Sequence, residues 1–352
     1  MKVAVIGATG AVGREMTRIL EERRFPVDAF VPLASARSAG RTVRFAEADH
    51  EVRELTIEAL AGVELAFVSA GATASRAFLP DIVTTHGTVC IDNSSAFRMD
   101  PDCPLSIPEV NPEALEGWPR PGIIAVPNCT TITAMLPIGP LHRAAGLRRL
   151  VLSSYQAVSG AGQRGTRELA EQIDKLHGQV ESLARPDPAS LPQGELFAKP
   201  IAFNVVAKIG EFEDDGFTGE EAKMMAEPRK ILSLPDLDVL ATSVRVPVVT
   251  GHAVSILAEF SRTIDVAEAR ALLAAAPGVT LMDDPAADVF PSPLDAAGRD
   301  DAYVGRIRQV PGHADALALF SCADNLRKGA ALDAIQIAEA LFPTGDRVGD
   351  RE

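Results

Sequence analysis

A cysteine stands where an apolar run ends and a threonine-rich segment begins, in the stretch IIAVPNCTTIT around Cys129. Most buried cysteines behave as small, inert hydrophobic side chains. A cysteine at a helix N-terminus differs, because the unpaired backbone N–H groups there favour the nucleophilic thiolate. Cys129 is therefore a candidate nucleophile. The remaining cysteines show no spacing typical of a zinc site or a disulfide framework, so a reducing compartment such as the cytoplasm fits best; they are Cys90, Cys103 and Cys322.

A glycine-rich turn follows the first apolar run. Between a predicted strand, Lys2–Ile6, and a predicted helix stand Gly7, Ala8, Thr9, Gly10, Ala11, Val12 and Gly13. Glycines in such a turn let the backbone approach a pyrophosphate, whose charge the helix N-terminus stabilises. The spacing is G-x-x-G-x-x-G rather than G-x-G-x-x-G, and an ordinary tight turn is the alternative. The position between strand and helix favours a dinucleotide site.

The second predicted strand, Ala29–Ala34, runs into the loop SARSAG. An NAD-specific domain offers an Asp or Glu to the ribose 2′-hydroxyl about 20 residues after the glycine motif. This loop instead carries Arg37 and Ser38, and a guanidinium with a hydroxyl suits a 2′-phosphate. We therefore predict NADP as the cofactor. The alternative is that Arg37 is a solvated surface side chain.

A thiol nucleophile together with a nicotinamide indicates aldehyde oxidation through a thiohemiacetal, from which hydride leaves to give a thioester. This chemistry needs a base. Among the six histidines we select His252, because it follows a strand that also carries Arg245. A turn lies between these two residues, so whether their side chains share a face stays open.

Further charged residues are candidate ligands for anions. Arg98 stands in DNSSAFRMD, and Lys223 stands in GEEAKMM. Glu220 lies three residues before Lys223 on a predicted helix, which Thr218 and Glu221 would open as a capping box. Taken alone, each of these charges is also compatible with a solvated surface position.

We expect alternating strands and helices to position these residues. Short apolar runs rich in β-branched residues are separated by stretches long enough for helices, which is typical of βαβ units and a parallel sheet. The first helix carries Val12, Met16, Ile19 and Leu20 at helical spacing. We therefore expect an α/β, Rossmann-like dinucleotide-binding domain at the N-terminus, with strands at Lys2–Ile6, Leu65–Ala70, Thr88–Asp92 and Ile123–Val126.

The pattern changes in the second half of the chain. A helix is expected from Thr166 to about Ala184, and strands at Val239–Val249 and Ala253–Phe260 joined by a turn indicate a largely antiparallel sheet. We expect a second, α+β domain for catalysis and dimerisation over residues 128–325. We expect the last predicted helix, Gly329–Phe342, to return to the first domain, so the NADP-binding domain would span residues 1–127 plus 326–352.

Composition narrows the class of partner. The 352 residues carry a formal net charge of −14, and no basic run interleaved with aromatic residues occurs, which argues against nucleic acid or an anionic membrane surface. No apolar run is long enough to span a bilayer, and the N-terminus lacks the pattern of a signal peptide. No metal-ligand spacing is found. Any anionic ligand must therefore be held by local positive charges.

Ten motifs in order resemble the bacterial aspartate-semialdehyde dehydrogenase family. The resemblance extends from residue 2 to about residue 342, and an ordered set is far more specific than any single motif. The motifs are GATGAVG, LASARSAG, DNSSAFRMD, VPNCTT, YQAVSGAG, IAFNV, FTGEEAKM, SVRVPV with GH, YVGRIR and DNLRKGAAL.

The resemblance implies reversible, NADP-linked conversion of L-aspartyl 4-phosphate to L-aspartate 4-semialdehyde and inorganic phosphate, on the route to lysine, diaminopimelate, methionine and threonine. It implies at least a homodimer, with a tetramer as the alternative. It also implies Cys129 as the nucleophile, His252 as the acid/base and Gln156 as a residue that positions the thioester. Substrate would be bound by Asn128, Arg98, Glu220, Lys223 and Arg245, and NADP by the glycine turn with Arg37, Ser38, Ser159, Gly160 and Asn325.

Some positions depart from the family pattern, and two rival functions remain. Pro228 stands where a helix would continue and should kink or end it, and Asp333 replaces the usual Asn of GAALN. The closest rival is a related acyl-phosphate reductase such as N-acetyl-glutamyl-phosphate reductase, against which the Glu220 and Arg245 pair favours a free amino acid. The other is a non-catalytic NADP-binding sensor, which the retained Cys129 and His252 argue against.

Overall fold

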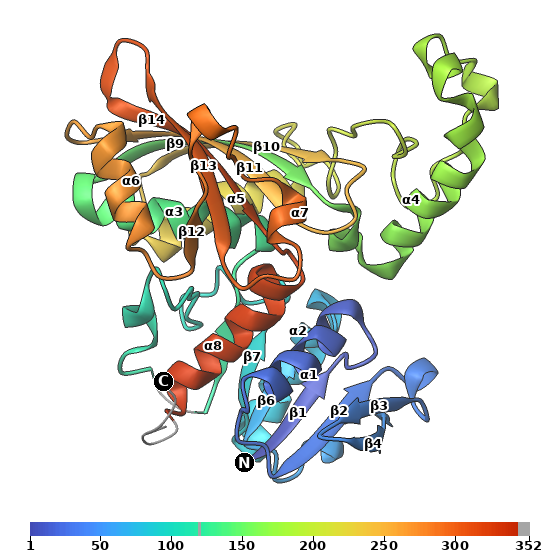
Figure 1. The fold of residues 1–352 in the computed structure, drawn as a ribbon. Coiled ribbons are helices and arrows are strands. Elements are labelled where there is room, and N and C mark those ends of the chain that lie inside the picture. Colours follow the sequence, from blue (N-terminus) through green and yellow to red (C-terminus); the bar gives the residue numbers. More distant parts are fainter. Residues whose placement is uncertain (119–120, 344–352) are drawn as a thin grey trace. The chain divides into compact units, whose positions relative to one another are not determined.

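The computed structural model describes residues 1–118 and 121–343 and divides the chain into two compact units (Figure 1). The first unit contains Met1–Asn128, Lys230–Ser233 and Gly329–Glu352, and the second contains Cys129–Arg229 and Leu234–Lys328. These limits differ from the expected domains chiefly because the short segment Lys230–Ser233 joins the first unit. The end of the expected NADP-binding domain, after residue 343, lies outside the described residues.

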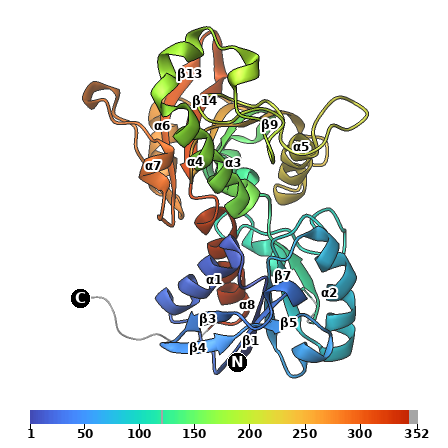
Figure 2. The ribbon, with the colours of Figure 1, turned by 90° about the vertical axis from the view of Figure 1, so that its right-hand side faces the viewer.

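The first unit is built on a parallel sheet of six strands in the order β5-β2-β1-β6-β7-β8. Its central strands are continuous apolar runs because both faces of a parallel sheet are covered by helices. Figure 2 shows α1 and α8 on one side of this sheet and α2 on the other. The Rossmann-like prediction is confirmed. The elements are β1 (Lys2–Ile6), α1 (Ala11–Glu22), β2 (Ala29–Ala34), η1 (Ala36–Ser38), β3 (Thr42–Phe45), β4 (Ala48–Glu51), β5 (Arg53–Glu54), η2 (Glu58–Leu60), β6 (Leu65–Val68), α2 (Ala72–His86), β7 (Val89–Asp92), η3 (Pro112–Leu115), β8 (Ile123–Ala125) and α8 (Leu332–Leu341).

The second unit is built on a mixed sheet of six strands in the order β10-β9-β11-β14-β13-β12. The three central pairs are antiparallel, and the two edge pairs are parallel. Helix α3 is almost wholly buried and packs against β9, β11 and β14. The elements are α3 (Cys129–Ala145), β9 (Leu147–Gln156), η4 (Val158–Ala161), α4 (Gly162–Leu176), η5 (His177–Ala184), η6 (Pro188–Ser190), α5 (Gly219–Ile231), β10 (Asp238–Arg245), β11 (His252–Phe260), α6 (Val266–Ala274), β12 (Val279–Leu281), η7 (Pro285–Ala287), α7 (Pro293–Ala296), β13 (Ala302–Val310), β14 (His313–Ala323) and η8 (Arg327–Ala331).

The expected hairpin between the two predicted strands of the second domain is wrong. Strands β10 and β11 are not neighbours, because β9 lies between them and pairs parallel to β10 and antiparallel to β11. The strand predicted to run to Val249 ends at Arg245. The residues after it turn away and bond to the segment that follows β9, where the N–H of Val158 donates to the carbonyl of Val248 at 2.8 Å.

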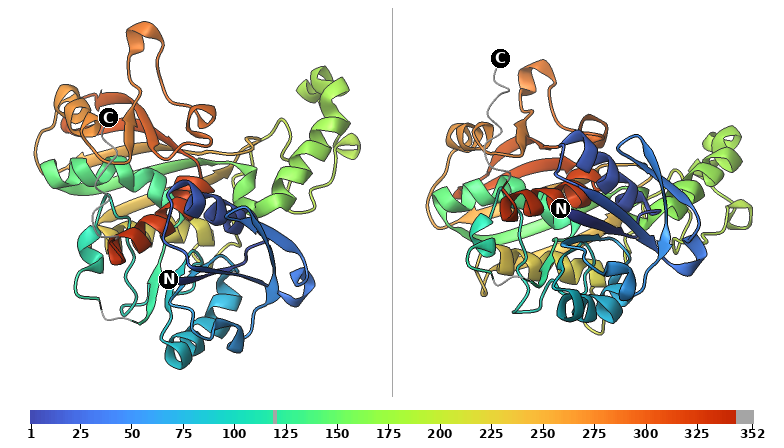
Figure 3. Two further views of the ribbon diagram at one scale, coloured as in Figure 1. Left: turned by 60° about the horizontal axis from the view of Figure 1, so that its bottom comes forward. Right: turned by 90° about the horizontal axis from the view of Figure 1, so that it is seen from below.

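Two predicted helices also differ from the structure. The α-helix expected to reach Ala184 ends at Leu176 and continues as 3-10 turns with a non-helical residue at Gln179. This extension stands apart from the sheet of the second unit (Figure 3). Pro228 was expected to kink or end α5, and the helix does not end there but continues to Ile231. Asp333 is fully buried in the first turn of α8.

Candidate active site

Cys129 is the first residue of α3 and is partly exposed. The other three cysteines are buried, and burial raises the pKa of Cys90 and Cys322 to about 12 and that of Cys103 to about 11. Because a thiolate is the reactive form, these three thiols are poor nucleophiles at neutral pH. The structure therefore singles out Cys129 as the thiol that is both accessible and at a helix N-terminus, as the sequence predicts.

Three predicted residues meet at one edge of the sheet of the second unit. The register places Arg245, the last residue of β10, opposite Gln156, the last residue of β9. Strand β11 begins at His252 and runs antiparallel to β9, so its start lies at this same edge. All three side chains are buried. The sequence leaves open whether the side chains of Arg245 and His252 lie together. In the structure β9 lies between their two strands, and the end of β10 and the start of β11 bring the two residues to the same edge of the sheet.

The His252 imidazole is fully buried and held by the backbone of Ala157. The N–H of Ala157 donates to Nδ1 of His252 at 3.0 Å. Burial, and secondarily the positive charge of Arg245, lowers the pKa of His252 to about 3, although Glu220 acts in the opposite direction. The ring is therefore neutral across the physiological range.

Arg245 is also hydrogen bonded to the backbone of Ala157. Its Nη1 donates to the carbonyl oxygen of Ala157 at 2.7 Å. Burial lowers the pKa of the guanidinium, while the negative charges of Glu220 and Cys129 oppose this shift. A guanidinium stays charged even so. Arg245 is thus a buried cation within electrostatic range of the Cys129 sulfur.

Glu220 and Lys223 lie on the first turns of α5, as predicted. The capping box is present, since the N–H of Thr218 donates to Glu221 at 2.7 Å and the N–H of Glu221 donates to Thr218 at 3.4 Å. Lys223 Nζ lies 3.1 Å from a carboxylate oxygen of Glu220. The other oxygen of Glu220 accepts a hydrogen bond from Gln156 Nε2 at 3.3 Å. The second unit thus joins Gln156, Glu220 and Lys223 in one polar chain.

The predicted cofactor residues of the second unit lie beside Arg245 and His252. Ser159 and Gly160 belong to η4, and Asn325 follows β14. Ser159 and Asn325 are hydrogen bonded to each other, and Asn325 Oδ1 also accepts the N–H of Gly251 at 2.9 Å. A Cβ atom on Gly160 would stand 2.9 Å from Nη1 of Arg245 and 3.1 Å from Nε2 of His252. Only glycine leaves these two side chains undisturbed.

The first unit holds the remaining predicted cofactor residues. Gly7 has a φ of +88°, and a Cβ there would meet the carbonyl oxygen of Ser69 at 2.3 Å, while a Cβ on Gly13 would meet the carbonyl oxygen of Gly7 at 2.2 Å. The turn therefore requires glycine for close packing. Gly10 caps α1 without any side-chain hydrogen bond, so the first N–H groups of that helix face the turn. An uncapped N-terminus beside a glycine turn fits a pyrophosphate.

Arg37 and Ser38 follow β2, where an adenosine ribose would be read. Arg37 is exposed, and within the described ranges no hydrogen bond or ion pair holds its guanidinium. Ser38 is buried, with 8% of its surface exposed. A cation without an internal partner at this position fits an added phosphate on the ribose.

Arg98 is buried in the loop after β7 and is held by backbone carbonyls. Its Nε donates to Val126 and its Nη2 to Asn93, each at 2.9 Å. Asp92 shapes the same loop, since it accepts from Ser94 and from Ser75. Burial raises the pKa of Asp92 despite these hydrogen bonds and the positive charge of Arg98. Asn128 is also buried, at the end of the first unit.

Lys230 is a residue that the sequence reading missed. Its ammonium donates to the carbonyl oxygens of Arg98, Asp100 and Cys103 at 2.8, 2.6 and 2.8 Å. Burial lowers its pKa. Lys230 therefore braces the loop that carries Arg98. No short-range pattern marks this role, because the residues it joins are about 130 positions away.

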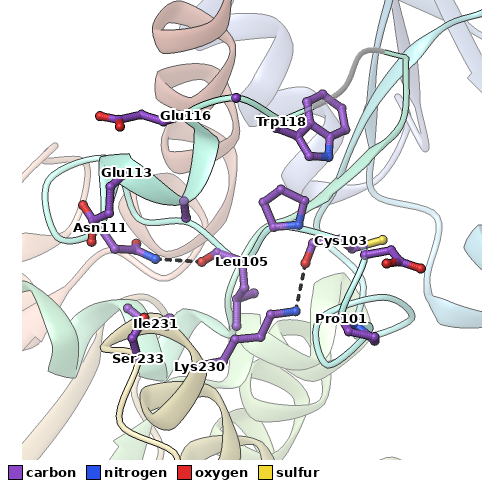
Figure 4. Close-up of a pocket in the computed structure, with 14 residues that line it drawn as sticks. Pro101, Cys103, Leu105, Asn111, Glu113, Glu116, Trp118, Lys230, Ile231 and Ser233 are labelled. Carbon is purple, nitrogen blue, oxygen red and sulfur yellow. Dashed lines mark hydrogen bonds between the residues drawn. The ribbon is translucent and has the colours of Figure 1, made fainter.

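The same lysine lines a cavity of about 430 Å³ in the first unit (Figure 4). Its walls also include Cys103, Asn111 and Trp118, and Asn111 donates to the carbonyl of Leu105 at 2.9 Å. None of the residues predicted for the active site lines this cavity. Over the described residues, no group of three or more His, Cys, Asp or Glu side chains could hold a metal ion, and no helix is long and apolar enough to cross a membrane.

Comparisons with known proteins agree with this architecture. Two family models match the chain: the semialdehyde dehydrogenase NAD binding domain over residues 2–118, and the semialdehyde dehydrogenase dimerisation domain over residues 138–328. The NAD(P)-binding domain and the dimerisation domain thus correspond to the parallel and mixed sheets.

Individual relatives match over nearly the whole chain. An aspartate-semialdehyde dehydrogenase of Aquifex aeolicus is 44% identical, with 98% of each chain covered, and one of Mycolicibacterium smegmatis is 47% identical, with 97% of this chain and 99% of the relative covered. Among solved structures, aspartate semialdehyde dehydrogenase II of Vibrio cholerae, complexed with ASA, is 40% identical with a TM-score of 0.89 and 97% of each chain covered. This chain therefore belongs to the aspartate-semialdehyde dehydrogenase family.

Proposed function

We propose that this protein catalyses the reversible, NADP-linked reductive dephosphorylation of L-aspartyl 4-phosphate to L-aspartate 4-semialdehyde and inorganic phosphate, in the synthesis of lysine, diaminopimelate, methionine and threonine. The observation that carries the proposal is the cluster in the second unit. A partly exposed cysteine at a helix N-terminus lies within electrostatic range of a buried arginine, which shares the backbone of Ala157 with a buried neutral histidine.

Cys129 is the proposed nucleophile. Its thiolate attacks the acyl carbon, so that a C–S bond forms and the C–O bond to phosphate breaks, leaving a thioester on the enzyme. The nicotinamide cofactor supplies the hydride that reduces this thioester. The C–S bond then breaks, which releases the aldehyde and restores the thiolate. His252 is the proposed acid–base residue, and Gln156 would position the thioester.

Charge complementarity supports the substrate. An α-amino acid presents a carboxylate and an ammonium group, and the cluster offers Arg245 for the first and Glu220 for the second. Both side chains are buried, so each needs an opposite charge when substrate replaces water. An acylated amino group, as in N-acetyl-glutamyl phosphate, carries no positive charge and would offer Glu220 no cation beyond Lys223. Arg98, Lys223 and Asn128 are proposed for the phosphate and the rest of the substrate.

NADP is the proposed cofactor. The glycine turn and the uncapped start of α1 would hold the pyrophosphate, and the exposed Arg37 with Ser38 would hold the 2′-phosphate. Ser159, Gly160 and Asn325 are proposed for the nicotinamide end. Residues 1–127 plus 326–352 are proposed as the NADP-binding domain. Residues 128–325 are proposed as the domain for catalysis and dimerisation.

A homodimer is proposed through the open face of the mixed sheet. Tyr155 and Leu240 project from this face with 40% and 44% of their surfaces exposed, and the Tyr155 ring lies 6.1 Å from that of Phe320. Exposed apolar side chains on one sheet face are typical of a protein interface. Light scattering after gel filtration tests this, and a Tyr155→Arg variant should shift the mass toward the monomer.

The direct test is NADP reduction in the presence of L-aspartate semialdehyde and phosphate. We expect reduction that requires phosphate and that Cys129→Ser abolishes. N-acetyl-glutamate semialdehyde serves as the competing substrate. Faster turnover of that compound would favour the rival reductase, and no turnover of either compound by the folded protein would refute the proposal.

A further inference from the structure

Phe197 places its ring over the guanidinium of Arg245. The guanidinium carbon lies 5.9 Å from the ring centroid, and both side chains are buried. The face of an aromatic ring attracts a cation, and the attraction is stronger where water is excluded. Within the described residues, Ala157 is the only hydrogen-bond partner of this guanidinium, through its carbonyl oxygen and Nη1. The Phe197 ring is thus a second restraint on Arg245.

Phe197 belongs to a surface segment without regular secondary structure, residues 194–202, which we call the strap. Leu196 and Ala198, on either side of Phe197, are exposed, whereas Phe197 itself is 9% exposed. The strap therefore turns this one side chain inward, into a cluster that contains Val158 and Leu169. Burying a side chain from an irregular segment costs conformational entropy, so the segment must be held by other contacts.

Two side chains of α4 hold the strap on both sides of Phe197. The carboxylate of Glu168 accepts the backbone N–H groups of the two residues before Phe197, at 3.2 and 2.7 Å. Gln172 Oε1, one helical turn further, accepts the N–H groups of the last two strap residues, at 2.7 and 3.1 Å. Glu168 and Gln172 are both buried and are hydrogen bonded to each other at 3.1 Å. The helix thus supplies the hydrogen bonds that a neighbouring strand would otherwise give.

The ring also packs closely against α4. A Cβ atom on Gly165 of this helix would stand 3.2 Å from Cζ of Phe197, and a Cβ atom on Gly194 would stand 2.1 Å from the carbonyl oxygen of Phe197. The absence of a side chain at both positions lets the strap and its ring approach this closely. The Phe197 ring is therefore in close contact with both α4 and the guanidinium of Arg245.

We propose that Phe197 is a positioning residue for substrate binding. Its ring fixes the plane of the Arg245 guanidinium, so that the N–H donors not bound to Ala157 point in one direction, toward the α-carboxylate of the substrate. A carboxylate accepts two parallel hydrogen bonds only when the planar guanidinium faces it edge-on, so rotation of the guanidinium loses one of the two. This inference deepens the proposed function and rests on it, because the carboxylate-binding role of Arg245 is part of that proposal.

Phe197→Leu tests the role of the ring, because leucine keeps an apolar side chain in the cluster and removes the aromatic face. We expect KM for aspartate semialdehyde to rise about 10-fold, while kcat and KM for NADP change by less than about twofold. Leu176→Ala is the matched control, since Leu176 belongs to the same cluster, and it should leave KM within about twofold of the wild type. An equal rise in KM in the control, or a loss confined to kcat in Phe197→Leu, would overturn the proposal.

The Arg245→Lys background tests whether the effect passes through the guanidinium. Lysine keeps the positive charge but cannot form two parallel hydrogen bonds to a carboxylate. We therefore expect Phe197→Leu to change KM for aspartate semialdehyde by less than about twofold in this background. A rise of about 10-fold here as well would show that Phe197 acts independently of Arg245, and would refute the proposal.

Phenylglyoxal, an arginine reagent whose adducts are located by mass spectrometry, measures the restraint on Arg245 without any turnover. In the full-length Phe197→Leu protein we expect Arg245 to react about 10-fold faster than in the wild type and in Leu176→Ala. Gln172→Met, which releases the strap, should also raise the rate, whereas Gln179→Met at an exposed position should not. Equal rates of Arg245 modification in all these proteins would overturn the proposal. If the wild-type protein does not reduce NADP with aspartate semialdehyde and phosphate, the proposed function fails, while the modification rates still decide whether Phe197 restrains Arg245.

Discussion

Gly160→Ala tests whether the cluster of the second unit depends on the space beside this glycine. The new Cβ would stand 2.9 Å from Arg245 Nη1 and 3.1 Å from His252 Nε2, whereas ordinary contacts begin at 3.4 Å. One or both side chains must therefore move by up to about 0.5 Å. Since a misplacement of about 1 Å costs roughly 100-fold in rate, we expect kcat/KM to fall about 10-fold, equivalent to about 1.4 kcal/mol.

The assay separates this effect from loss of fold or of cofactor. Gly160 does not adopt a left-handed backbone, so alanine imposes no φ strain, and the thermal midpoint should stay within about 3 °C of the wild type. We expect kcat to fall and KM for aspartate semialdehyde to rise, because both Arg245 and His252 are displaced. Gly178→Ala is the matched control, since a Cβ there meets no atom within 4 Å.

Two outcomes would refute the reasoning. Activity of Gly160→Ala within about twofold of Gly178→Ala would show that the cluster tolerates the displacement. A rise in KM for NADP alone, with kcat unchanged, would show that Gly160 serves the cofactor and not the two side chains.

Four further predictions follow from the same structure. Iodoacetamide at about pH 8 should label Cys129 in the native protein, whereas the three buried thiols with raised pKa values should react only after unfolding, which mass spectrometry will show. Arg37→Asp should raise KM for NADP about 10-fold or more and leave KM for NAD unchanged or lower; equal changes for both cofactors would remove Arg37 from the 2′-phosphate site. Lys230→Met should cost about 2 to 4 kcal/mol in urea unfolding, because three partly buried hydrogen bonds from a charged donor to carbonyls are lost, while the exposed Lys175→Met should cost almost nothing. Finally, the pKa of His252 is about 3 when folded and about 6.5 when unfolded, so the unfolded chain binds the proton first as pH falls. The wild type should therefore lose about 2 kcal/mol more stability than His252→Gln between about pH 7 and pH 5, and equal losses would place the folded pKa near its ordinary value.

Local patterns in the sequence were sufficient for the main strands and the first helix of the first unit, whereas β3, β4 and β5 were not predicted. Strand β1 and helix α1 have the predicted positions because an apolar run followed by a glycine turn and a 3.6-residue period leaves few alternatives. The capping box at Thr218 was equally local. Cys129 was found because the motif around it marks both the end of a strand and the start of a helix.

Features that depend on distant residues could not be predicted in this way. The hairpin expected between the strands at Val239 and Ala253 was wrong because β9, almost a hundred residues earlier, inserts between them. The hydrogen bond from the N–H of Ala157 to His252 joins residues 95 positions apart. No sequence pattern indicates which backbone N–H will donate to a distant side chain. Lys230 was missed for the same reason. These contacts arise from tertiary packing, which a single sequence does not encode at any fixed spacing.

Helix α8, which contacts α1 and β7 in the first unit, is the last of the described elements to be made. About 200 residues separate the end of the first long segment of that unit from α8, so at ribosomal rates of about 5 to 20 residues per second the wait is roughly 10 to 40 seconds. During this interval the face of the nascent sheet that α8 later covers has no permanent cover. Synthesis order thus leaves the nucleotide-binding half the last to be completed, and a chain that terminates early would expose apolar strands to chaperones and proteases rather than yield a working half-enzyme.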